Sequence, residues 1–187
     1  MQIHDTIAGL RTALKGAGRI AFVPTMGNLH EGHIALMRQA QAHGDTVVSS
    51  LFSEPPAVRP EGGLRHLPAH LRRRLREDGG GWRSPPLLAW RKEMYPTPQA
   101  YHVQPDPAQA DILEGEFRPG FFRGVATVVM KLFSVVQPQV AILARRDYQQ
   151  LMIIRKMVRQ FALPIEIIRA IQCGRRTGLA CPPATAT

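Results

Sequence analysis

The first 52 residues alternate short apolar runs with one stretch of helical spacing. The runs RIAFV (19–23) and TVVSSLF (46–52) have the length and composition of buried strands. Between them, residues 24–32 are predicted to be loop and residues 33–44 to be helix. The inward face of that helix carries Ile34, Met37 and Ala40. This order of elements is typical of a β–α–β unit in a parallel sheet.

Another helix is predicted before the first strand. Asp5 or Thr6 can cap its N-terminus, and Gly16 and Gly18 can end it. Its apolar face carries Ile7, Leu10 and Leu14.

The same order returns in the second half of the chain. Residues 122–137 predict a helix whose apolar face carries Val125, Val128, Val129, Leu132 and Val136. QVAILA (139–144) predicts a strand, DYQQLMIIRKMVRQFA (147–162) a helix and PIEII, from 164, a further strand. The predicted fold is therefore an open α/β, Rossmann-like parallel sheet with helices on both faces. Such sheets bind ligands at the carboxyl ends of their strands.

Residues 53–92 fit neither a helical nor a strand period. They hold six prolines and five glycines, but no Ile, Asn or Tyr. A structureless span of this length is unusual inside a compact domain, so the segment has the character of an insertion.

Composition and charge exclude several classes of protein. A chain of 187 residues with 44% hydrophobic residues is long enough for one globular domain. The net charge of +10 by itself would favour nucleic-acid binding. Its distribution argues against that, because the two off-pattern segments hold most of it: residues 53–92 contribute +5 and residues 169–187 contribute +3. Cys173 and Cys181 lack the spacing of a metal site or redox motif. The N-terminus lacks a secretory apolar core, which predicts a cytoplasmic protein.

The candidate chemistry lies in MGNLHEGH, residues 26–33, between the first strand and its helix. A helix N-terminus offers free N–H groups to a phosphate, and His30 and His33 can hydrogen-bond phosphate oxygens as charge develops. The spacing is wrong for a His-Glu-x-x-His zinc site. The alternative is a helix cap with two incidental surface histidines, but the position after a strand favours nucleotide chemistry.

Four segments resemble the pantothenate synthetases (pantoate–β-alanine ligases), a family of nucleotidyltransferases with a His-x-Gly-His signature. These segments are VPTMGNLHEGH, LEGEFRPGFFRGVATVVMKLF, RRDYQQLMIIRKMV and PIEII. The resemblance covers residues 1–52 and 93–168. It implies condensation of pantoate with β-alanine through a pantoyl-adenylate, with ATP as substrate, Mg²⁺, and a homodimer as the assembly.

The resemblance also implies roles for individual residues. His33 would be the proton donor, His30 and Arg146 would meet the ATP phosphates, and Gln150 would hold pantoate. Asp147 would hold the ribose. From the sequence without the resemblance, the favoured interpretation is that Asp147 is only a helix cap and Gln150 only a surface residue of the helix. The implied ATP contacts are Met26, Gly27, Asn28, Leu29, His30, Glu31, Gly32, His33, Ala144, Arg145, Arg146 and Asp147.

Several positions depart from the family pattern. Ala144 and Arg146 stand where the family has Gly and Lys, and Phe121 stands where it has His. The family's Asn-x-x-Gln-Phe and Ser-Ser-Arg-Asn motifs, which bind pantoate and ATP, do not occur in the chain. The C-terminal domain that covers the family's active site is also expected to be missing.

Both missing motifs appear when the off-pattern segments are back-translated and read in another frame. With synonymous codons chosen to favour this outcome, residues 53–71 can yield VNRLQFGPKADFDTYPRT, and residues 169–187 can yield GDTVRAADGLGLSSRNGY. The hypothesis is that residues 53–92 and the tail from 169 are frameshifted, which leaves 1–168 as the nucleotide-binding domain and a weak or inactive catalyst. The competing functions are another adenylyl-transferring enzyme and a non-catalytic basic nucleic-acid-binding module that uses residues 65–76.

Overall fold

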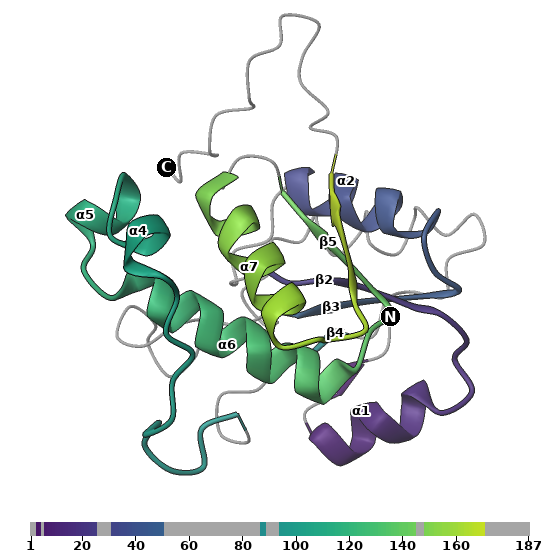
Figure 1. Cartoon of the computed structure of the whole chain (residues 1–187). Helices are drawn as coiled ribbons and strands as arrows, with labels where there is room; N and C mark the ends of the chain where they lie inside the picture. Colours follow the sequence, from purple (N-terminus) through teal and green to yellow (C-terminus); the bar gives the residue numbers. More distant parts are fainter. Residues whose placement is uncertain are drawn as a thin grey trace, which may run out of the picture.

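A six-stranded parallel sheet organises the molecule, with the strand order β1-β4-β3-β2-β5-β6. Figure 1 labels its central strands β4, β3, β2 and β5. The computed structural model describes residues 3–4, 6–25, 31–50, 87–88, 94–144 and 148–170. The strands are β1 (Ile3–His4), β2 (Ile20–Val23), β3 (Thr46–Ser50), β4 (Leu87–Leu88), β5 (Val140–Leu143) and β6 (Glu166–Arg169). The helices are α1 (Ile7–Leu14), α2 (Glu31–Ala40), α4 (Pro107–Ala110), α5 (Glu114–Phe117), α6 (Phe121–Val136) and α7 (Tyr148–Gln160).

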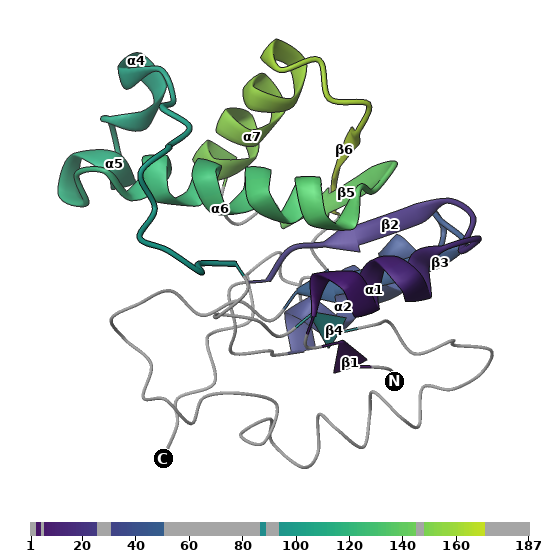
Figure 2. The same cartoon turned by 90° about the horizontal axis from the view of Figure 1, so that it is seen from below.

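Helices cover both faces of the sheet, which confirms the predicted fold class. On one face, α6 and α7 pack with Leu10 of α1 against Phe22 and Ala141 of the central strands. On the other face, α2 packs against Ala21 and Val23 (Figures 1 and 2). All four residues of β2 are buried, as expected of a central parallel strand covered on both faces.

The long periodic segments were predicted correctly, apart from their ends. The predicted loop over 24–32 is wrong at its C-terminal end, because α2 begins at Glu31 rather than at 33. The reason is tertiary, since Ile34, Met37 and Ala40 are fully buried and stabilise the helix in spite of Gly32 in its first turn.

The span 53–92, which the sequence pattern assigns to no element, contributes one strand to the sheet. Leu87–Leu88 form β4, which pairs in parallel with Ser49 and Ser50 of β3 and with β1. Ladder hydrogen bonds join backbone groups, so two apolar residues suffice without any sequence period. The rest of the span lies outside the described residues.

The helix before β2 starts and stops as its sequence indicates. The Thr6 hydroxyl caps α1 by accepting a hydrogen bond of 3.0 Å from the Gly9 N–H. Gly18 has a φ of +70°, and a Cβ there would lie 2.5 Å from the Asp45 carboxylate. That carboxylate accepts the Arg19 N–H at 2.7 Å, so Gly18 permits the contact that aligns the starts of β2 and β3.

No helix in the described part of the chain has both the length and the apolar character needed to cross a membrane.

Candidate functional site

The sheet has a topological switch point between β2 and β5. From β2 the chain moves outward through β3 to β4, and it then returns to place β5 on the other side of β2. β2 and β5 pair in parallel, with Ala21 opposite Val140 and Phe22 opposite Ala141, so their carboxyl ends lie at the same edge. The crevice at such a point is where open α/β sheets bind their ligands.

The predicted site residues follow these two strands. α2 begins after the connection from β2, and α7 begins after the connection from β5. In parallel units of this kind, the helix N-termini face the edge at which the strands end, and their dipoles favour an anion there. The described elements that flank the two predicted segments, 26–33 and 144–150, therefore lie at one edge of the sheet.

The residues of these segments divide between described and undescribed positions. Gly32 and His33 lie in the first turn of α2, where Gly32 is exposed and His33 is half-buried. Ala144, directly after β5, and Gln150, in the first turn of α7, are also half-buried. Outside the described residues are Met26, Gly27, Asn28, Leu29, His30, Arg145, Arg146 and Asp147; of Glu31, only the backbone is described.

The side chain of Gln149 links α7 to α4 and to the segment that follows α4. Its Nε2 donates hydrogen bonds to the carbonyl oxygens of Gln109, at 2.8 Å, and Ile112, at 2.7 Å. This link fixes the first turn of the helix that carries Gln150. The sequence contains no signal for it, because the partners are backbone groups about 40 residues away.

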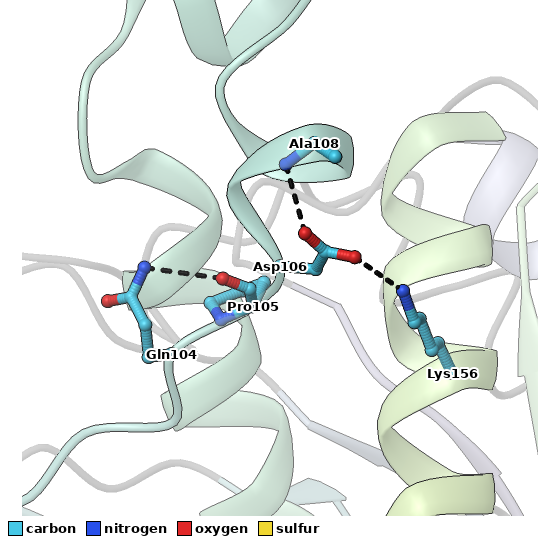
Figure 3. Close-up of polar contacts among 5 residues, drawn as sticks. All are labelled: Gln104, Pro105, Asp106, Ala108 and Lys156. Atoms are coloured by element: carbon cyan, nitrogen blue, oxygen red, sulfur yellow. Dashed lines mark hydrogen bonds and ion pairs between the residues drawn. The ribbon is translucent and has the colours of Figure 1, made fainter.

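An ion pair makes a second link between α4 and α7 (Figure 3). The Asp106 carboxylate caps α4 by accepting the Ala108 N–H at 3.1 Å, and its other oxygen lies 2.7 Å from the Lys156 Nζ. The hydrogen bond from Lys156 is the main cause that lowers the pKa of Asp106. Because its pKa is lower in the folded state, the Asp106 carboxylate stabilises the fold at pH values above the usual pKa of an aspartate. This stabilisation is lost as the pH falls through the folded-state pKa.

Lys131 of α6 holds the segment that leads into α4. Its ammonium group donates to the Met94 carbonyl and, at 2.7 Å, to the Gln99 Oε1. It also lies 3.9 Å from the centre of the Tyr95 ring, a cation–π contact. Burial lowers the pKa of Lys131. One ammonium group thus fastens residues 94–99 to the sheet-covering helix.

Phe121, which stands where the resembling family has His, makes aromatic contacts instead of polar ones. The guanidinium carbon of Arg118 lies 3.6 Å from the centre of its ring. Phe122 packs edge-on against it, with the ring centres 5.0 Å apart. Arg118 also pairs with Glu114 at 2.9 Å, so the start of α6 is held by a local cluster.

A hollow of about 370 Å³ lies at the opposite end of the sheet, beside the starts of β2 and β3. Its lining residues are Arg19, Gln41, Ala42, His43, Gly44 and Asp45. Because ligands of open α/β sheets bind at the carboxyl ends of strands, this hollow is the less favoured place for a nucleotide.

Comparison with known proteins identifies similar sequences and structures. Residues 2–182 match the family model described as pantoate-beta-alanine ligase. The chain is 52% identical over 190 residues to the pantothenate synthetase of Leptothrix cholodnii, with 96% of this chain and 65% of that protein covered.

Two similar crystal structures extend the comparison. The pantothenate synthetase of Thermus thermophilus has a TM-score of 0.80 and 40% identity, with 97% of this chain and 66% of that chain covered. The pantoate-beta-alanine ligase of Francisella tularensis, complexed with beta-gamma ATP and beta-alanine, has a TM-score of 0.80 and 31% identity, over 97% and 71% of the two chains. This chain thus spans about two thirds of the length of these relatives.

Proposed function

The chain belongs to the pantoate–β-alanine ligase family, and from this premise we propose that it descends from an enzyme that joins pantoate to β-alanine at the expense of ATP. The main support is the match of residues 2–182 to the family, together with the position at the β2–β5 switch point of the strands that precede the predicted segments. The ATP and β-alanine bound to the Francisella ligase support the same substrates here. Neither competing function, a second type of adenylyl transfer or nucleic-acid binding, is favoured by any of these observations.

The proposed reaction has two displacement steps. A carboxylate oxygen of pantoate attacks the α-phosphorus of ATP, the bond to the bridging oxygen breaks, and pyrophosphate leaves. The amine of β-alanine then attacks the acyl carbon of pantoyl-adenylate. The bond from the acyl carbon to the AMP oxygen breaks, the nitrogen loses a proton to solvent, and AMP leaves as the amide bond is formed.

In this proposal, the two connections at the switch point divide the work. Residues 26–33 lie along the ATP phosphates. There, His30 and His33 donate hydrogen bonds to the α-phosphate, and His33 is also the proton donor of the reaction. On the other side, Arg146 meets the phosphates and Asp147 holds the ribose, with Ala144 and Arg145 completing the contact. Gln150, whose helical turn Gln149 fixes, holds pantoate.

Mg²⁺ is proposed to accompany ATP. In the described segments, no three or more His, Cys, Asp or Glu side chains are grouped so that they could hold a metal ion. Mg²⁺ commonly binds through substrate phosphates with few protein ligands, so ATP itself would carry most of its contacts. When bound, Mg²⁺ would neutralise phosphate charge. We further propose a cytoplasmic homodimer.

We also propose that residues 53–92 and 169–187 are read out of frame and that residues 1–168 are a single nucleotide-binding domain. The Asn-x-x-Gln-Phe and Ser-Ser-Arg-Asn motifs would then be lost from the chain as written. Loss of one preorganised transition-state group typically costs about 10²–10³ in rate. The chain is therefore expected to bind ATP weakly and to turn over slowly.

The reaction class is tested by an assay of all products with each substrate omitted in turn. AMP and pantothenate are expected to form slowly, in equal amounts, and only when pantoate, β-alanine and ATP are all present. Release of ADP, or AMP formation that does not depend on pantoate, would contradict the proposed reaction. A turnover rate normal for the family would contradict the proposed impairment instead.

A further inference from the structure

We propose that the hydroxyl groups of Thr25 and Ser50 form a buried clasp that positions the start of the histidine loop, which makes them positioning residues of the nucleotide site. The inference rests on the proposed function, since it concerns the loop that would bind the ATP phosphates. Thr25 directly precedes Met26, the first implied ATP contact, and Ser50 is the last residue of β3.

The two residues exchange three hydrogen bonds. The Thr25 N–H donates to the Ser50 Oγ at 3.1 Å, and the Ser50 hydroxyl donates to the Thr25 carbonyl oxygen at 3.3 Å. In addition, the Thr25 hydroxyl donates to the Ser50 carbonyl oxygen. Each residue thus uses both its hydroxyl and its backbone, and the pair fixes where the chain leaves β2.

The clasp is sealed from solvent. Thr25 is 2% exposed and Ser50 is 1% exposed, so water does not replace a lost partner easily. Removing one hydroxyl would leave buried backbone groups without a hydrogen bond, which is costly in a dry environment. The point at which the chain enters residue 26 is therefore held in place by the Thr25–Ser50 contacts.

The strand itself does not provide this restraint. β2 ends at Val23, and the next residue, Pro24, has no N–H to donate to a ladder. The Val23–Ser49 pair is the last in the register between β2 and β3. Beyond this pair, the hydrogen bonds between Thr25 and Ser50 replace those of the ladder and keep the ends of the two strands aligned.

Ser49 supplies a matched control. It is fully buried, and its hydroxyl donates to the Val23 carbonyl oxygen at 3.1 Å, within the strand pair and not to the loop. Ser49→Ala and Ser50→Ala therefore remove the same group from neighbouring buried positions. Only Ser50→Ala opens the clasp.

The test measures ATP affinity by titration of each isotope-labelled variant, at a temperature where thermal unfolding shows all of them to be folded. Ser50→Ala and Thr25→Val are expected to weaken ATP binding about tenfold, as when only a tenth of the molecules hold the competent loop. Thr25→Ser keeps the hydroxyl and is expected to bind ATP like the unmodified chain. Ser49→Ala is expected to bind ATP like the unmodified chain. Equal weakening by Ser49→Ala and Ser50→Ala would overturn the proposal, because a general loss of stability would then explain both.

Amide hydrogen exchange over residues 26–30 gives a second readout that does not need the ligand. Ser50→Ala is expected to speed exchange there several-fold more than Ser49→Ala does. Unchanged exchange in Ser50→Ala would overturn the clasp, whatever the ATP result. If the unmodified chain does not bind ATP although exchange responds as expected, the proposed function fails and the clasp stands.

Discussion

Replacement of both off-pattern segments by their alternative-frame sequences is expected to raise the rate of pantothenate formation by at least about 100-fold. The replacements begin VNRLQF at residue 53 and GDTVRA at residue 169. They return two groups of polar side chains, the Gln of Asn-x-x-Gln-Phe and the Ser-Ser-Arg-Asn cluster, to a site whose histidine loop is already in the sequence. Each such preorganised group is typically worth about 10²–10³ in rate.

Single replacements act as controls for this gain. Replacement of the segment at 53 alone is expected to raise kcat/KM for pantoate. Replacement of the segment at 169 alone is expected to raise kcat/KM for ATP. Initial rates measured at varied concentrations of each substrate separate the two effects. If the doubly replaced chain folds and is no faster than the original, the frameshift hypothesis is wrong. The nucleotide sequence of the gene gives an independent test of the frameshift hypothesis. The hypothesis is wrong if one reading frame runs through the codons of residues 52–53 and 168–169 and no alternative frame encodes the two motifs.

Phe22→Ala is expected to lower the free energy of unfolding by about 3–5 kcal/mol, the usual cost of emptying the space of a buried phenylalanine. Phe22 is 0% exposed in the middle of β2. It contacts Phe133 of α6 edge to face, with ring centres 6.2 Å apart, and it joins the sheet to the helices on that face. Natural domains have only about 5–15 kcal/mol of stability in total, so this one change removes a large part.

Phe161→Ala provides the comparison for denaturant unfolding. Phe161 follows α7 and is 56% exposed, so its removal leaves little cavity. A change within about 0.5 kcal/mol is expected at such a surface position. If the two variants lose similar stability, Phe22 does not lie in the core as described.

The sequence predicts the sheet and its main helices because their apolar faces repeat with a clear period. Val125, Val128, Val129, Leu132 and Val136 were predicted to share one face of a helix, and all five are buried in α6. Burial of that face decides the structure, so the pattern is sufficient. The pattern does not determine helix ends, where capping and tertiary contacts compete, as the early start of α2 shows.

The hydrophobic pattern of the sequence did not predict the short elements or the polar contacts between elements. β1 and β4 have two residues each, and α4 and α5 have four each, which is too few for a period to appear. The contacts of Gln149 and Lys131 join residues 32 to 40 positions apart, through partners that include backbone carbonyls. For the site, sequence motifs predicted the segments, and the fold placed their flanking elements at one edge. The roles of the individual residues remain predictions.

ATP binding at the switch point is tested by an ATP titration of the isotope-labelled chain, with the perturbed backbone amides assigned. Binding at the switch point predicts changes confined to residues 25–33 and 144–150, which follow β2 and β5. His33→Ala is expected to weaken or abolish these changes. Changes centred on Arg19 and residues 43–45, at the opposite end of the sheet, would contradict the account, and so would the absence of any change at saturating ATP.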